Sequence, residues 1–138
     1  MLAAFLMNGR YAPYAFALLR IMAGAMFLIH GSGKILNIPP SDMHPPIASM
    51  GGIGGIIELI CGLLITIGLF AHFAAFIASG EMAVAYFYAH FPHGWNPVAN
   101  HGESAVLYCF VFLYIAAHGA GIWSIDSMIG KGRTTRRA

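Results

Sequence analysis

The sequence predicts an all-α integral membrane protein, a bundle of four transmembrane helices whose N- and C-termini both face the cytoplasm. Composition is the first observation behind this fold class. Of the 138 residues, 59% are hydrophobic and only 9% are charged, whereas about a quarter of the residues in soluble domains are charged. The second observation is that the apolar residues gather in four segments, each long enough to cross a hydrocarbon core of about 30 Å at about 1.5 Å per residue. A soluble fold is therefore disfavoured.

The four expected helices follow one another along the chain. They cover residues 14–36, 48–70, 71–91 and 104–125, and a basic tail, residues 126–138, comes after them. The first connection (NIPPSDMHPP) has four prolines, and the third (PHGWNPVANHGE) is rich in Pro, Gly and Asn, so neither continues a helix. Hardly any loop separates the second helix from the third, which predicts a tight antiparallel pair. No repeat is visible, so residues 1–138 are expected to form one domain.

The start of the chain is too weakly charged for a cleavable signal peptide, so the first helix is expected to remain in the mature protein. Positive charge in the short flanking segments then predicts the orientation. Lys34 is alone on one side, and the opposite side carries Arg10, Lys131, Arg133, Arg136 and Arg137. This asymmetry predicts a multi-pass protein of a bacterial inner membrane, with the first and third connections outside. The net charge of +2 comes mainly from the basic tail and not from a basic surface of the helices. The expected partner is therefore the lipid bilayer, and nucleic acid is not expected.

Ionisable residues inside the spans are costly in lipid and usually face the bundle interior with a partner. Helical spacing places Glu81 on an alanine stripe and Glu58 on a glycine stripe, the sides on which helices pack. Counting rise along each helix brings Arg20 within reach of either carboxylate. We expect one glutamate to pair with Arg20, and the other to find His30 or Lys34 or to exchange protons. The alternative is a structural ion pair that only fixes the helix register.

A polar pocket within the bundle is the candidate site. Its proposed catalytic residues are Arg20, Glu58 and Glu81, and the proposed pocket residues are His30, Lys34, Glu103, Tyr108 and His118. No metal is expected. His90, His93 and His101 are weak candidates, because Pro92 interrupts the helix that would bring the first two imidazoles together.

Four stretches of sequence carry a resemblance to a known family. They are LRIMAGAMFLIHGSGKIL, GGIIELICGLLITIGLF, SGEMAVAYF and GESAVLYCFVFLYIAAHGAGIWSID. With these motifs the chain resembles the DoxX family of small four-helix membrane proteins across about residues 15–127. Ala120 departs from the family pattern, in which many members have a proline at the end of the last helix, and this departure affects the helix terminus.

The resemblance implies a membrane component of a quinone-linked oxidoreductase system. The sequence has no haem, flavin or nucleotide motif, so electron chemistry would use a diffusible quinone or another redox protein of the membrane or periplasm. Two other classes stay open, a non-catalytic membrane partner or scaffold, and a conduit for protons or a small solute. The sequence leaves open whether the protein is itself a catalyst and whether it forms an oligomer.

Overall fold

The computed structural model describes residues 9–135, and the side chains of residues 9–130. The described chain is all-helical and contains no strand, which confirms the all-α class. Its α-helices are α2 (Ala12–Leu36), α3 (Met50–Ile67), α4 (Ala71–Ala85), α5 (Glu103–His118) and α6 (Ile125–Thr135). A π-helix (Tyr86–His90) and a 3₁₀ turn (Phe91–His93) prolong α4. The segment judged too weakly charged for a signal peptide lies largely outside the described residues, and so do Arg136 and Arg137 of the tail.

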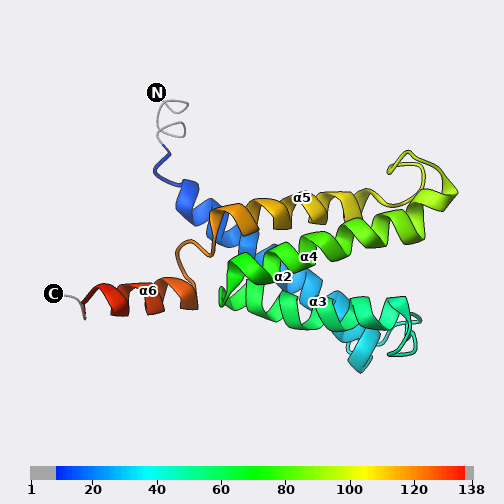
Figure 1. Cartoon of the computed structure of the whole chain (residues 1–138), viewed down its shortest axis with the longest axis horizontal. Helices are drawn as coiled ribbons and strands as arrows, with labels where there is room; N and C mark the ends of the chain where they lie inside the picture. Colours follow the sequence, from blue (N-terminus) through cyan, green and yellow to red (C-terminus); the bar gives the residue numbers. More distant parts are fainter. Residues whose placement is uncertain (1–8, 136–138) are drawn as a thin grey trace.

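Two helical hairpins make up the body of the molecule. Helix α2 packs along α3, α4 packs along α5, and α3 joins the two pairs by packing against α4 (Figure 1). Glycines permit the close approach of α2 and α3. A Cβ atom on Gly31 would meet the backbone of Leu59, and a Cβ atom on Gly62 would meet the backbone of Leu28. The interpretation of the glycines as helix-packing residues is therefore confirmed at these positions.

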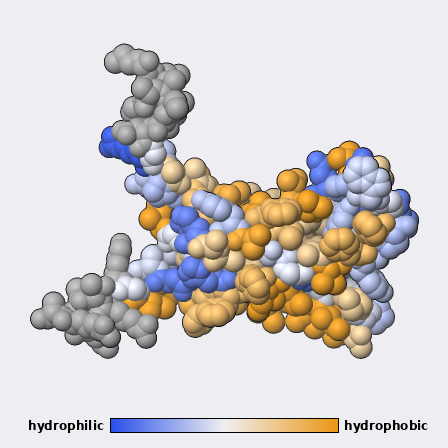
Figure 2. Space-filling model, turned by 45° about the horizontal axis from the view of Figure 1, so that its top comes forward, coloured by the Kyte–Doolittle hydropathy of each residue, from blue (hydrophilic) through white to orange (hydrophobic). Residues whose placement is uncertain are grey.

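The outer surface of the bundle exposes many large apolar side chains. On α4 the alanine stripe is buried as predicted, while Phe73 and Phe76 on other faces are 74% and 67% exposed. Figure 2 shows apolar residues over the middle of the body and hydrophilic residues gathered toward its ends. Soluble proteins rarely expose contiguous apolar surface on this scale. Helices α2 and α3 are also long and apolar enough to cross a membrane, and α5 is a shorter apolar helix. The surface suits contact with lipid.

The end of the last predicted helix was wrong. Helix α5 stops at His118, because Gly119, Gly121 and Trp123 have φ angles of 92°, 68° and 54°, outside the helical range. The chain turns there. Most of the segment that was expected to be a tail forms a separate helix, α6, which extends away from the bundle (Figure 1). The other three helices match their predicted ranges to within a few residues, once the π-helix is counted with α4.

Candidate functional site

Arg20 is fully buried, and its guanidinium binds backbone carbonyls. Nη1 donates to the carbonyl oxygens of Ile65 (2.9 Å) and Thr66 (3.1 Å), and Nη2 donates to those of Ile122 (3.3 Å) and Trp123 (2.8 Å). The first two carbonyls belong to the last turn of α3, where carbonyls have no partner within the helix. The other two belong to the turn between α5 and α6.

The predicted pairing of Arg20 with Glu58 or Glu81 is therefore wrong. The described guanidinium donates to carbonyls at one end of the bundle and to neither glutamate. The physical reason is that carbonyls in the last turn of a helix lack the donors of the next turn and can accept a side-chain hydrogen bond, even where, as at Ile65, the N–H of Gly68 also donates at 3.2 Å. Arg20 joins the end of α3 to the turn before α6, and this geometry gives it a structural role.

Asp126 completes this junction from the first turn of α6. Its carboxylate accepts hydrogen bonds from the backbone N–H groups of Phe70 and Ala71, each at 2.9 Å, at the start of α4. Its own N–H donates to the carbonyl oxygen of Gly68 (2.9 Å), and its carboxylate interacts electrostatically with Arg20. A negative group at a helix N-terminus satisfies unpaired donors there. Asp126 is a residue that sequence reasoning missed.

At the other end of the bundle, Lys34 pairs with Glu58. The ammonium lies 2.8 Å from Oε1 of Glu58, and the two side chains are only 17% and 4% exposed. Gly55 on α3 leaves room for the Lys34 stem, since a Cβ atom there would sit 3.0 Å from Cβ of Lys34. Arg20 was the partner expected for Glu58, and His30 or Lys34 was expected only for the remaining glutamate, so the Lys34–Glu58 pair corrects that assignment.

Glu81 reaches the same region from α4. Its Oε1 lies against Gly54, 2.9 Å from where a Cβ atom would be. Gly54 and Glu58 are four residues apart and therefore share a face of α3, and Glu81 interacts electrostatically with both Glu58 and Lys34. Tyr108 on α5 interacts in the same way with Glu58. We call Lys34, Glu58, Glu81 and Tyr108 the buried polar cluster.

Three atoms of the buried polar cluster are buried without a hydrogen-bond partner among the described residues. They are Oε2 of Glu58, Oε2 of Glu81 and the Tyr108 hydroxyl oxygen. Most buried polar groups in proteins are hydrogen-bonded, and those that are not are explained by strain, a catalytic role, or a bound water molecule or ion. The buried polar cluster therefore has capacity for further donors.

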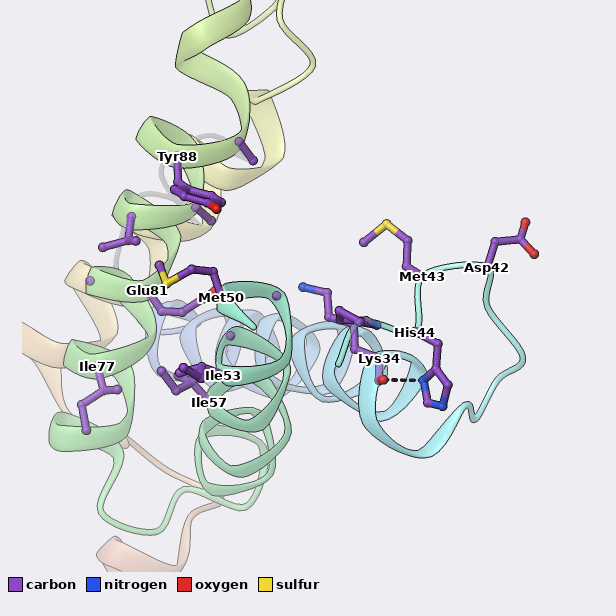
Figure 3. Close-up of a pocket in the computed structure, with 17 residues that line it drawn as sticks. Lys34, Asp42, Met43, His44, Met50, Ile53, Ile57, Ile77, Glu81 and Tyr88 are labelled. Atoms are coloured by element: carbon purple, nitrogen blue, oxygen red, sulfur yellow. Dashed lines mark hydrogen bonds between the residues drawn. The ribbon is translucent and has the colours of Figure 1, made fainter. Parts of the chain in front are cut away.

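A cavity of about 730 Å³ opens beside the buried polar cluster. Lys34 and Glu81 line it, and Figure 3 shows them reaching it from either side of the first turns of α3. Its apolar walls include Met50, Ile53, Ile57, Ile77, Val84 and Tyr88. The cavity therefore combines apolar walls with ionisable groups, among them Lys34 and Glu81.

The loop after α2 forms part of the cavity wall, which sequence reasoning had missed. Asp42, Met43 and His44 line the cavity, and His44 donates from Nδ1 to the carbonyl oxygen of Lys34 at 2.6 Å (Figure 3). The available signal was an acidic residue and a histidine in a short segment close behind Lys34. This segment had been treated only as a connection.

Four of the predicted pocket residues do not line the cavity, and of these only Tyr108 belongs to the buried polar cluster. His30 is exposed and its Nδ1 is 2.8 Å from the carbonyl oxygen of Met26, although its ring lies 6.4 Å from that of Tyr108. Glu103 is exposed at the start of α5. His118 is exposed at the opposite end of α5, with its ring 3.8 Å from that of Phe16. The side chains of His30, Glu103 and His118 are all exposed, so they do not face the bundle interior in which the pocket was expected.

The three metal candidates are not assembled into a site. His90 and His93 direct Nδ1 toward the carbonyl oxygens of Asn100 and Ala89, each at 3.2 Å. The part of the chain that the structure describes holds no group of three or more His, Cys, Asp or Glu able to bind a metal ion.

Comparison with known proteins identifies the family. The family model described as DoxX matches residues 15–91, more than half of the chain, including Arg20, Lys34, Glu58 and Glu81. The chain belongs to the DoxX family. Two proteins of Haemophilus influenzae, both described as uncharacterized, are similar to this DoxX-family chain. One is 41% identical over 129 residues, covering 88% of this chain and 96% of that protein. The other is 29% identical over 100 residues, covering 72% and 62%.

No solved structure matches the chain. Within this DoxX-family protein, the buried polar cluster and its cavity are the described region best suited to chemistry. Lys34 can donate hydrogen bonds, a glutamate carboxylate can accept them, and a protonated glutamate can do both. The cavity can thus hold a ligand that is largely apolar and has a few polar atoms at one end.

Proposed function

We propose that this DoxX-family protein is a membrane component of a quinone-linked oxidoreductase system, and that its cavity binds the quinone headgroup. The observation that carries the proposal is an apolar cavity of about 730 Å³ with Lys34 and Glu81 in its wall. Binding sites for small molecules usually have about 300–1,000 Å³ and are mostly apolar, with a few polar groups that fix orientation. A quinone has that composition, since it carries carbonyl oxygens on an apolar ring.

The donor set of the cavity fits such a ligand. The Lys34 ammonium donates hydrogen bonds, as a quinone carbonyl requires, and Oε2 of Glu81 has no hydrogen-bond partner among the described residues. When bound, the quinone would supply two-electron, two-proton redox chemistry. The residues of this chain would orient the headgroup, exclude water with the apolar walls, and hold or accept a proton at Glu81. Electrons would come from or go to another redox protein of the membrane or periplasm.

The proposal includes a membrane arrangement. Helices α2, α3, α5, and α4 with its π-helical extension, would each cross the bilayer, and α6 would lie on the cytoplasmic side with the basic tail. The start of α2 and α6 lie toward the same end of the bundle in Figure 1, as an even number of crossings requires. The positive charge near that end favours the cytoplasmic side of a bacterial inner membrane. The cavity and the loop after α2 would then face the periplasm.

The test measures quinone retained by purified protein in lipid nanodiscs that contain a defined quinone. Glu81→Gln and Glu81→Leu should lower retention several-fold, because both remove the carboxylate from the cavity wall. Gly80→Leu should also lower it. Gly80 lines the cavity and has open space beside it, so the larger side chain would narrow the cavity without removing an ionisable group.

Glu103→Gln is the matched control, since it neutralises an exposed glutamate outside the cavity and should retain quinone as the wild type does. Wild-type retention by both Glu81→Leu and Gly80→Leu would overturn the proposal. That result would favour the role of a non-catalytic membrane partner.

A further inference from the structure

The buried polar cluster has more acidic than basic groups. Lys34 is engaged with Glu58 at 2.8 Å. Arg20 is the other cation in the helical interior, and it is committed to four backbone carbonyls and to Asp126 at the far end of the bundle. Two carboxylates therefore face one ammonium, and Glu81 has no cation of its own among the described side chains.

The neighbouring groups do not offset this negative charge. Tyr108 from α5 and Cys61 from α3 both interact electrostatically with a glutamate of the cluster, but neither group carries positive charge. His30 on α2 is exposed and contacts the Met26 carbonyl. In the loop after α2, the His44 ring bonds to the Lys34 carbonyl, and Asp42 adds another acid at the cavity mouth.

An unpaired carboxylate away from water has a large desolvation cost, and one additional positive charge offsets that cost. Glu58 is 3% exposed, and its Oε2, like Oε2 of Glu81, has no hydrogen-bond partner among the described residues. A bound proton offsets the excess negative charge and supplies a missing hydrogen-bond donor, because it neutralises one carboxylate and turns it into a donor. A metal cation fits less well, since the Lys34 ammonium already lies 2.8 Å from Glu58 and would repel it.

We propose that Glu58 and Glu81 together hold one exchangeable proton, carried mainly by Glu81, which the cavity exchanges with the aqueous phase. The step is a simple acid dissociation. The O–H bond of the Glu81 carboxyl breaks, its electron pair stays on the carboxylate oxygen, and the proton leaves through the cavity that Glu81 lines. No oxidant or reductant takes part. The proposal concerns the protein without ligand, so it does not depend on quinone binding.

Infrared difference spectroscopy of the full chain in quinone-free lipid bilayers tests the proposal, because a protonated carboxyl group has its own C=O stretching band. At neutral pH the wild type should show this band, and the band should shift when H₂O is replaced by D₂O. Glu81→Gln should lose the band. Glu58→Gln should lose it as well, because Lys34 then becomes free to pair with Glu81.

Lys34→Met gives the opposite expectation. Without the ammonium both carboxylates are uncompensated, so the band should grow relative to the wild type. Glu103→Gln should leave the band unchanged, as this glutamate is exposed on α5. Because Glu58→Gln and Lys34→Met remove a buried ion pair and could fail to fold, Glu81→Gln alone is sufficient to decide.

Three outcomes would overturn the proposal. They are a wild-type spectrum with no protonated carboxyl band at neutral pH, a band that persists in Glu81→Gln, and a band that disappears when sodium or potassium ions are added at constant ionic strength. The last outcome would mean that a metal cation occupies the place of the proton. A band that behaves as expected in a protein that retains no quinone would support the proton site and reject the proposed function.

Discussion

The two buried cations should behave differently when each is removed together with Glu58. Lys34 contacts Glu58 at 2.8 Å and the two side chains are 17% and 4% exposed, so Lys34→Met leaves a buried carboxylate unpaired. Breaking such a pair by removing one partner costs about 3–5 kcal/mol. Glu58→Gln should cost less, since the freed ammonium can then compensate Glu81. The double variant should lose about 1–3 kcal/mol less than the sum of the single losses, because contacting residues couple by such amounts.

A second double-mutant cycle, Arg20→Gln with Glu58→Gln, is the control for the Lys34–Glu58 cycle. Arg20→Gln removes the hydrogen bonds to four carbonyls and should strongly lower the free energy of unfolding. The loss in the double variant Arg20→Gln with Glu58→Gln should equal the sum of the two single losses to within about 0.5 kcal/mol, as expected of sites without shared partners. The assay is reversible unfolding of each variant in mixed micelles or bicelles, with the free energy of unfolding taken from the denaturant dependence. Additive losses for Lys34 and Glu58, or strong coupling between Arg20 and Glu58, would refute the assignment of partners.

Three further predictions concern the junction, the helix packing and the topology. Asp126→Ala should lower the free energy of unfolding by about 1–2 kcal/mol, since it leaves two N–H groups of α4 without their acceptor; an unchanged value would contradict this capping role. Gly31→Ala should destabilise, because its Cβ atom would meet the backbone of α3, whereas Gly80→Ala, with open space beside it, should not. Equal stabilities for the two would argue against the close approach. In intact cells a cysteine at Ser41 should react with a membrane-impermeant thiol reagent and one at Ser127 should not, and the reverse labelling would invert the proposed orientation.

Periodicity in the sequence was sufficient to predict the inward-facing sides of α3 and α4. Small residues at spacings of three and four mark the packing side of a helix in lipid, so the burial of Glu58 and of the alanine stripe on α4 followed from their positions alone. The partner of Arg20 could not be predicted in this way. Counting rise along ideal helices compares depths of side chains, but it does not show where a helix ends and leaves carbonyls without donors.

The part of the cavity wall that a loop forms could not be predicted from helix geometry either. The wall includes the loop after α2, and the path of a loop depends on contacts that are distant in sequence. The end of α5 was missed because an apolar run continues through Gly119 and Gly121, and only their positive φ angles show that the helix has stopped. This turn also supplies two of the four carbonyls that Arg20 binds. One misplaced helix end therefore accounts in part for the misassigned arginine.

The contrast between the two polar regions leads to a last prediction, on Glu81. At the junction, Nη1 and Nη2 of Arg20 are bound to carbonyls and help hold three helix ends together, whereas Glu81 contributes an uncompensated acid to the buried polar cluster. Replacing a buried ion pair by apolar residues of similar volume is often neutral or stabilising by about 1–4 kcal/mol, and removing Glu81, which has no cation of its own among the described side chains, leaves no partner charge unpaired. Glu81→Leu should therefore unfold with a free energy equal to or above that of the wild type, while its quinone retention falls. The same unfolding assay measures this, with Glu81→Gln as the polar control of similar shape. A clear loss of stability in Glu81→Leu would show that Glu81 is part of the structural framework, and would remove the argument that its charge is kept for function.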